Sequence, residues 1–277
     1  MSLAQDLLQQ LERLAPFGRL PAVRALHLPP PPPPGGTKGE FCALELEDGS
    51  VGLSYVLLGN TWAELSASEL CRTLPGQDAL AVAQGFAHSD ALQRTVGFAA
   101  VNALTRWLFN RSDFAPPASA DSIGHLDPQP GETVGMIGHF TPLIPRITER
   151  GARLLIAELR EDLVGERDGV RVTLDARELA PCPKLLATGT LLLNDTLDAM
   201  LAHAPAARQI ALIGPSVGCP PDALFARGIT FLGGSWITDT PAYLAALREG
   251  RSAGSAARKF GLTTAQYPGW EALLARL

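Results

Sequence analysis

The residues most able to do chemistry follow an apolar run that ends in two closely spaced glycines, in the stretch Val134–Ile147 (VGMIGHFTPLIPRI). Gly135 and Gly138 begin the pattern of a dinucleotide-binding turn, in which glycines let the backbone approach a pyrophosphate. The third glycine of that pattern is absent, and His139 and Phe140 follow the turn instead. An imidazole at the end of a strand can transfer a proton or bind a metal ion. We therefore predict that His139 contributes to a ligand site and is the candidate metal ligand.

Short polar residues and glycines also follow the other apolar runs in the second half of the chain. The further candidates for ligand binding there are Glu158, Thr190, Asn194, Ser216, Gly218 and Ser235. Glu158 follows Gly135 at about the separation at which a dinucleotide fold places its ribose-binding acid. Neighbouring residues such as Thr141, Thr196 and Asp239 suit helix N-caps. Helix N-termini that share a crevice favour anions, so the sequence predicts a site for a carboxylate or a phosphate.

Some of these residues have structural interpretations as well. A histidine at the end of a strand can simply pack, and Cys219 is either a reactive thiol near a helix start or a small buried residue. The four cysteines are scattered, with no C-x-x-C pair. This spacing favours reduced thiols over a disulfide framework or a closed zinc site.

The elements that must position these residues alternate between short apolar runs and segments of helix length. Five runs are expected to be strands: Thr133–Ile137, Arg153–Glu158, Leu185–Leu193, Gln209–Gly214 and Ile229–Gly233. This alternation is typical of βαβ units around a parallel sheet that is covered on both faces. We therefore predict a Rossmann-like α/β domain over residues 132–277, with ligands bound outside the carboxyl ends of its strands.

The first half of the chain has the pattern of a small α+β domain. Asp48-Gly49 separates Glu40–Glu47 from Val51–Leu58, which predicts an antiparallel hairpin. Ala22–Leu28 looks extended, and Pro29–Pro34 suits an exposed polyproline II loop. Four segments have helical spacing: Leu3–Leu14, Ala63–Leu74, Asp78–Ala87 and Leu92–Phe109. Residues 1–115 are expected to form this domain, and the Pro- and Ser-rich residues 116–131 a linker.

Composition limits the possible partners. The chain has 277 residues, of which 46% are hydrophobic and 18% charged, as in a soluble globular protein. A net charge of -5 argues against binding to nucleic acid, which needs a basic face. No apolar run approaches the roughly 20 residues of a membrane helix, and the N-terminus lacks a signal-peptide pattern. We expect a cytoplasmic protein that binds a small molecule, and a homodimer is the commonest assembly for such a chain.

Four longer segments resemble, in order and spacing, the family described as "Putative heavy-metal chelation", whose function is not established. They are TVGFAAVNAL (Thr95–Leu104), VGMIGHF (Val134–Phe140), ATGTLLLNDTLD (Ala187–Asp198) and ALIGPSVGCPPDALFARGITFLGGS (Ala211–Ser235). The resemblance implies an enolase N-terminal-like domain followed by a Rossmann-like domain, with an active site in the cleft between them. By resemblance, Asn102, His139, Asn194 and Ser216 occupy the family's motif positions.

A single imidazole would not hold a metal ion tightly, because structural metal sites usually draw on four protein ligands. We therefore expect a divalent metal to arrive with its own ligands. The cleft would then bind an organic metal chelate or its precursor, with His139 supplying one bond. Two alternatives stay open: an enzyme that uses a nicotinamide or S-adenosylmethionine cofactor, and a non-catalytic interaction module. The sequence leaves open whether the protein is an enzyme.

Overall fold

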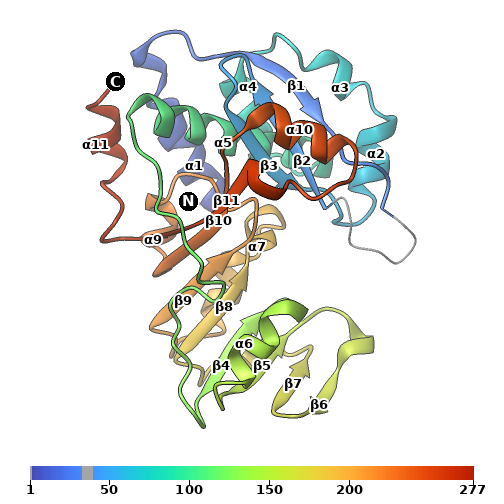
Figure 1. The fold of residues 1–277 in the computed structure, drawn as a ribbon, viewed down its shortest axis with the longest axis vertical. Helices are drawn as coiled ribbons and strands as arrows, with labels where there is room; N and C mark the ends of the chain where they lie inside the picture. Colours follow the sequence, from blue (N-terminus) through green and yellow to red (C-terminus); the bar gives the residue numbers. More distant parts are fainter. Residues whose placement is uncertain (1, 33–39) are drawn as a thin grey trace.

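Two β-sheets organise the protein, as the computed structural model shows for residues 2–32 and 40–277 (Figure 1). The first half of the chain builds a three-stranded antiparallel sheet, and the second half builds an eight-stranded, mostly parallel sheet. The predicted mixed α/β class is therefore confirmed. Part of the predicted Pro29–Pro34 loop, from residue 33 onward, lies outside the described residues.

The small sheet has the order β1-β2-β3, with β1 Val23–His27, β2 Phe41–Leu46 and β3 Val51–Tyr55. The predicted hairpin is present, and Gly49 turns it with a φ of 86°. The Asp48 carboxylate accepts hydrogen bonds from the backbone N–H and the hydroxyl of Ser50, at 3.1 and 2.8 Å. Local chemistry at the turn thus fixes the register of both strands.

Among the described residues of the first half, five α-helices accompany this sheet: α1 Leu3–Glu12, α2 Thr61–Ala67, α3 Leu70–Thr73, α4 Ala79–Ala83 and α5 Ala91–Arg111. Ser2 and Gln5 form a capping box that starts α1 where the spacing predicted it. The single helix expected over Ala63–Leu74 is wrong, because Ser68 adopts an extended conformation between α2 and α3. The Ser68 hydroxyl donates to the Leu65 carbonyl and so ends α2.

Helix α5 is the centre of the first half. The sequence predicted a helix over Leu92–Phe109, and in the structure the side chains from Thr95 to Phe109 are buried on nearly all sides, with Arg106 the exception. Gly97 lets the chain at Phe86 come close, since an added Cβ would lie 2.2 Å from the Phe86 nitrogen. In the part of the chain that the structure describes, no helix combines the length and the apolar character needed to cross a membrane.

The large sheet has the order β11-β10-β9-β8-β4-β5-β7-β6. Its strands are β4 Thr133–Ile137, β5 Arg153–Ala157, β6 Gly165–Arg167, β7 Val170–Thr173, β8 Lys184–Thr188, β9 Gln209–Ile213, β10 Phe231–Ile237 and β11 Ala257–Thr263. From β4 the chain moves outward through β5 and β7, then returns to β8 on the other side. The strand order therefore reverses between β4 and β8, which is where open α/β sheets commonly bind ligands.

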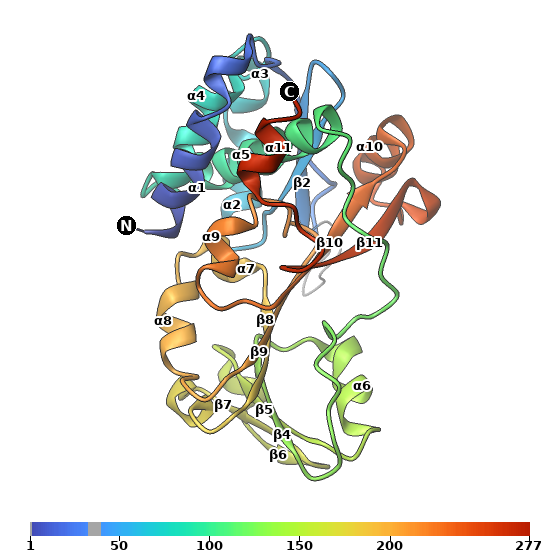
Figure 2. The same cartoon turned by 90° about the vertical axis from the view of Figure 1, so that its left-hand side faces the viewer.

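The strand expected over Leu185–Leu193 is wrong in its second half. β8 ends at Thr188, and Thr190–Leu193 forms the short helix α7. The other helices of the second half are α6 Ile144–Thr148, α8 Leu197–Ala202, α9 Asp222–Phe225, α10 Thr240–Arg248 and α11 Trp270–Leu274. The last strands and two of these helices return to the first half of the chain: α10 contacts β1, and α11 contacts α5 (Figures 1 and 2).

Strands β10 and β11 extend beyond their neighbour β9. β10 pairs with β9 only from Phe231 to Gly233, but it pairs with β11 over its whole length to Ile237. The last four residues of β10 therefore form a two-stranded ribbon with β11. Ile237 packs in one cluster with Ala43 and Leu53 of the small sheet. This ribbon runs from the large sheet towards the first half of the chain (Figure 2).

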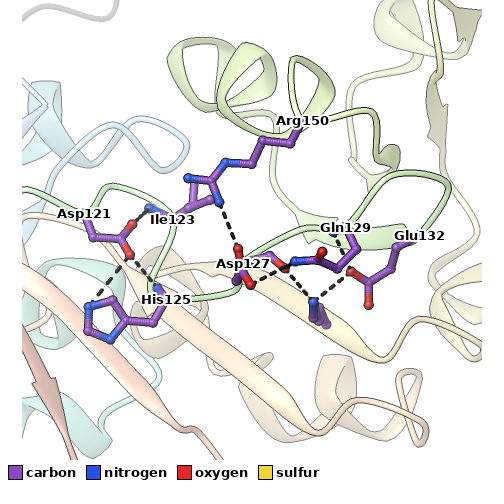
Figure 3. A network of polar contacts seen from close by, with 8 residues as sticks. Asp121, Ile123, His125, Asp127, Gln129, Glu132 and Arg150 are labelled. Carbon is purple, nitrogen blue, oxygen red and sulfur yellow. Dashed lines mark hydrogen bonds and ion pairs between the residues drawn. The ribbon is translucent and has the colours of Figure 1, made fainter.

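Hydrogen bonds hold the predicted linker, residues 116–131, in place along its length. The Asp121 carboxylate accepts from the backbone N–H groups of Ile123 and His125, both at 2.8 Å (Figure 3). Further on, Lys184 at the start of β8 lies 2.8 Å from Glu132. Burial raises the pKa of the Glu132 carboxyl, but hydrogen bonds from Lys184 and Gln129 outweigh this and hold it below its usual range. The linker thus anchors the amino ends of β4 and β8, away from the other end of the sheet.

Candidate pocket between the two sheets

A small pocket of about 40 Å³ lies where the β10–β11 ribbon meets β3 and α5. Its polar lining comes from α5, from the loop after β9 and from β10. The residues that matter for its chemistry are Asn102, Arg106, Ser216, Gly218, Ser235 and Trp236. Four of these were predicted from the sequence as ligand-binding residues, and the structure brings those four together around one space.

Asn102 connects both halves of the protein at this pocket. Its Nδ2 donates to the Leu53 carbonyl of β3 at 2.7 Å and to the Ser216 carbonyl in the loop after β9 at 2.9 Å. The side chain is buried, and its Oδ1 has no hydrogen-bond partner among the described residues. Asparagine is a mediocre residue for a helix interior, and its position on α5 is explained by these two interactions.

Arg106 lies one helical turn after Asn102 and lies over the Trp236 ring, with Cζ 3.5 Å from the ring centroid. Its Nε donates to Asn110 Oδ1 and its Nη2 to the Ile237 carbonyl, both at 2.9 Å. Arg258 also lies over Trp236, at 5.6 Å, and donates to the Pro116 carbonyl at 2.7 Å. Hydrogen bonds and a cation–π contact therefore hold the Arg106 guanidinium in place.

No carboxylate of the described residues directly neutralises the charge of these two guanidinium groups. Within residues 2–32 and 40–277, neither Arg106 nor Arg258 forms an ion pair with a carboxylate. Burial and the nearby Arg258 cation together lower the pKa of Arg106 to about 10, although Asp48 opposes the change. Burial also lowers the pKa of Arg258. Both side chains still carry their charge at neutral pH, so an anion in the pocket would be stabilised.

His139 does not line this pocket, so the hypothesis that its imidazole shares one pocket with Asn102 and Ser216 needs correction. It lies after β4, where its Nδ1 is 3.3 Å from the Thr141 hydroxyl. Its backbone N–H donates to Glu158 Oε2 at 2.8 Å, and the other oxygen of Glu158 accepts from Leu159 N at 2.7 Å. Phe140 packs against the core on one face of the large sheet. Glu158 thus ties together the turns after β4 and β5.

The remaining predicted residues also lie outside the pocket lining. Gly135 is a packing residue, because an added Cβ would lie 3.0 Å from Leu185 Cδ1. Gly138 has a φ of 86° and faces Thr188 at the reversal point of the sheet. The Thr190 hydroxyl lies 3.1 Å from that of Thr188. Asn194 is exposed and accepts a hydrogen bond from the Thr196 hydroxyl at 2.5 Å.

The order of the strands explains this separation. β4 is three strands away from β10, and neighbouring strands lie about 4.8 Å apart, so their ends are separated by roughly 14 Å. The first half of the chain sits beside β10 and β11, whereas β4–β7 lie at the far end of the molecule (Figure 1). The ends of the strands therefore supply two separate groups of polar residues.

The charged and thiol side chains do not gather as metal ligands. In the described part of the chain, no three His, Cys, Asp or Glu side chains are grouped so that they could hold a metal ion. Burial raises the pKa of the Cys219 thiol to about 12, which agrees with the buried rather than the reactive interpretation. Asp239 caps α10 by accepting from Ala242 N at 3.0 Å, as its sequence position predicted.

The sequence did not predict that Arg106, Arg258 and Trp236 meet at the pocket. Arg106 follows Asn102 by four residues, which places both on one face of a helix, and this spacing was the available signal. Trp236 and Arg258 are cross-strand partners on β10 and β11. No local pattern indicates that this ribbon extends beyond β9, so their meeting with Arg106 was not predictable.

The fold and the pocket thus define a two-sheet α/β protein with a cationic cleft between its sheets. Residues 121–266 and residues 39–105 match two sequence families that are both described as "Putative heavy-metal chelation". The first match alone covers more than half of the chain. The protein belongs to the first of these families, described as "Putative heavy-metal chelation", and the resemblance found from the sequence is confirmed.

Solved structures of the same family share the fold. A protein of unknown function from Desulfitobacterium hafniense DCB-2 is 20% identical, with a TM-score of 0.68 over 94% of this chain and 98% of that one. A protein of unknown function from Pyrococcus horikoshii is 20% identical, with a TM-score of 0.66 over 95% and 100%. An uncharacterized protein of Methanocaldococcus jannaschii is 29% identical over 154 residues, which cover 54% of this chain and 57% of that protein.

Proposed function

We propose that the protein binds a small carboxylate-bearing ligand, a metal chelator or its metal chelate, in the pocket between the two sheets. The observation that carries this proposal is the Arg106 guanidinium, which lines the pocket, is held over Trp236 and forms no ion pair in the described residues. Burying part of a cation without a neighbouring carboxylate costs free energy. A bound anion would remove this cost.

The lining of the pocket suits a small ligand. Gly218 brings the backbone of the loop after β9 to the surface of the pocket, and Ser235 adds a short side chain beside Trp236. Arginine also recognises carboxylates through paired N–H donors more readily than lysine does. These features support an organic anion over a macromolecular partner.

In this proposal the metal ion is cargo and arrives with ligands of its own. The pocket offers guanidinium, amide, hydroxyl and backbone groups, which bind organic anions, whereas thiolates and imidazoles are the usual protein ligands of heavy metals. The family description supports a link to chelation. A protein that recognises the carboxylates of a chelator agrees both with that description and with the side chains that line the pocket.

The residues after β4 do not support the alternative that the protein is an enzyme with a nucleotide-type cofactor. The turn at Gly138 leads into a three-residue 3₁₀ segment and then into α6, which has only five residues and contains Pro145. A dinucleotide site uses a longer helix whose N-terminus faces the pyrophosphate. We therefore place the proposed ligand at Arg106 and not at the turn after β4.

Replacing Arg106 with glutamine should weaken the binding of citrate by about 100-fold, because hydrogen bonds to a charged group contribute about 1.5–3 kcal/mol. Isothermal titration calorimetry of the full chain with citrate measures this effect. Arg111→Gln is the matched control, since Arg111 is an exposed arginine at the end of the same helix. Equal affinities of the wild type and Arg106→Gln, or no citrate binding at all, would contradict the proposal.

A further inference from the structure

The amide of Asn102 has only one orientation that its surroundings permit. Nδ2 lies 2.7 Å from the Leu53 carbonyl oxygen and 2.9 Å from the Ser216 carbonyl oxygen, so each of its two hydrogens has an acceptor. Turning the amide over would place Oδ1 against two carbonyl oxygens, with no donor between them. The Oδ1 atom must therefore point away from both carbonyls.

In this orientation, Oδ1 is a buried acceptor to which none of the described residues donates a hydrogen bond. Asn102 is 4% exposed, and Oδ1 makes no hydrogen bond with the described residues. Buried polar atoms almost always have a partner, so one without a partner calls for an explanation. Asn102 and Gly218 both line the pocket, and a Cβ added to Gly218 would lie 3.7 Å from Oδ1. The missing side chain of Gly218 therefore leaves room for about one methyl group beside this acceptor.

The acceptor and the cation of the pocket are neighbours on one helix. Asn102 and Arg106 are four residues apart on α5, which puts their Cβ atoms about 6 Å apart on the same face. Both line the same pocket. A ligand that satisfied both would carry an anionic group and an O–H or N–H donor.

Resting on the proposed function, we propose that the ligand is an α-hydroxy or α-amino carboxylate. Its carboxylate binds Arg106, and its hydroxyl or amino group donates a hydrogen bond to Asn102 Oδ1. Such compounds chelate metal ions through the hydroxyl or amino group and one carboxylate oxygen. The hydrogen on that group and the second carboxylate oxygen stay available to Asn102 and Arg106, so the free chelator and its metal chelate present the same recognition groups.

The test compares pairs of ligands that differ only in the donor. The probes are citrate against tricarballylate, L-malate against succinate, and L-aspartate against succinate, titrated calorimetrically into the full chain at fixed pH and ionic strength. In at least one pair, the member with the donor should bind about tenfold more tightly, the effect of one good hydrogen bond. Equal affinities within every pair would overturn the inference.

Gly218→Ala locates the effect at Asn102. The added methyl group would contact Asn102 at 3.7–3.8 Å, an ordinary van der Waals distance, so the variant should fold with an unchanged melting temperature. It would cover Oδ1, and the tenfold preference should fall to within about twofold. A preference that persists in this variant would also overturn the inference.

The outcomes separate this inference from the proposed function. Suppose that Arg106→Gln abolishes binding but that neither member of any ligand pair binds more tightly than the other. The carboxylate site at Arg106 would then be supported, and only the role of Asn102 would be rejected. Absence of binding for every probe would reject both.

Discussion

Gly52→Ala should lower the free energy of unfolding by about 3 kcal/mol, because β3 and α5 are in backbone contact at this position. A Cβ added to Gly52 would lie 2.1 Å from the Ala99 carbonyl oxygen and 2.3 Å from the Ala103 nitrogen. These are backbone atoms of a buried helix, so they cannot move aside as a flexible side chain could. Urea denaturation followed by circular dichroism measures the change.

Gly218→Ala is the matched control, because its added methyl group would meet only ordinary contacts of 3.7–3.8 Å. Its free energy of unfolding should stay within about 0.5 kcal/mol of the wild type. A loss below about 1 kcal/mol for Gly52→Ala would show that β3 does not approach α5 this closely. The side of the pocket that β3 and α5 form together would then have a different position.

Asn102→Ala should lower the free energy of unfolding by about 2–4 kcal/mol, since it removes two buried hydrogen bonds at once. One of these bonds reaches β3 in the first half of the chain, and the other reaches the loop after β9 in the second half. Thermal and urea denaturation measure the loss. Hydrogen exchange should also speed up in the loop around Ser216, which loses its bond to α5.

The control for this substitution is Asn60→Ala. Asn60 is an exposed asparagine that precedes α2 without a side-chain capping bond. Its replacement should change stability by less than about 0.5 kcal/mol. If Asn102→Ala were equally mild, the amide would not connect the two halves, and the orientation assigned to its Oδ1 would lose its basis.

The elements with strong local signals were predictable. Asp48-Gly49 needs a positive φ at the glycine and so identifies the hairpin, and the apolar runs identify β4, β5, β9 and β10 within a few residues. The strand predicted over Leu185–Leu193 was wrong in its second half, because a continuous apolar segment suits a buried strand and a buried helix equally well. β6, β7 and β11 were not predicted. The pairing of β11 depends on β10, far away along the chain.

The site was predictable only in part. Asn102 came from the resemblance, Ser216 from both the resemblance and its position after a predicted strand, and the structure places both at the pocket. His139 was expected beside them, but strand order decides which strand ends meet, and a single sequence does not reveal it. Arg106 resembles an ordinary solvent-facing arginine until Trp236 is known to lie beneath it. A contact between residues 130 positions apart leaves no local pattern.

A crystal structure of the protein with bound citrate tests the central claim most directly. We expect electron density for citrate in the pocket between the sheets, with a carboxylate within about 3.2 Å of the Arg106 guanidinium and the hydroxyl facing Asn102 Oδ1. Citrate bound beside His139 and Glu158, with the pocket at Arg106 unoccupied, would contradict the claim.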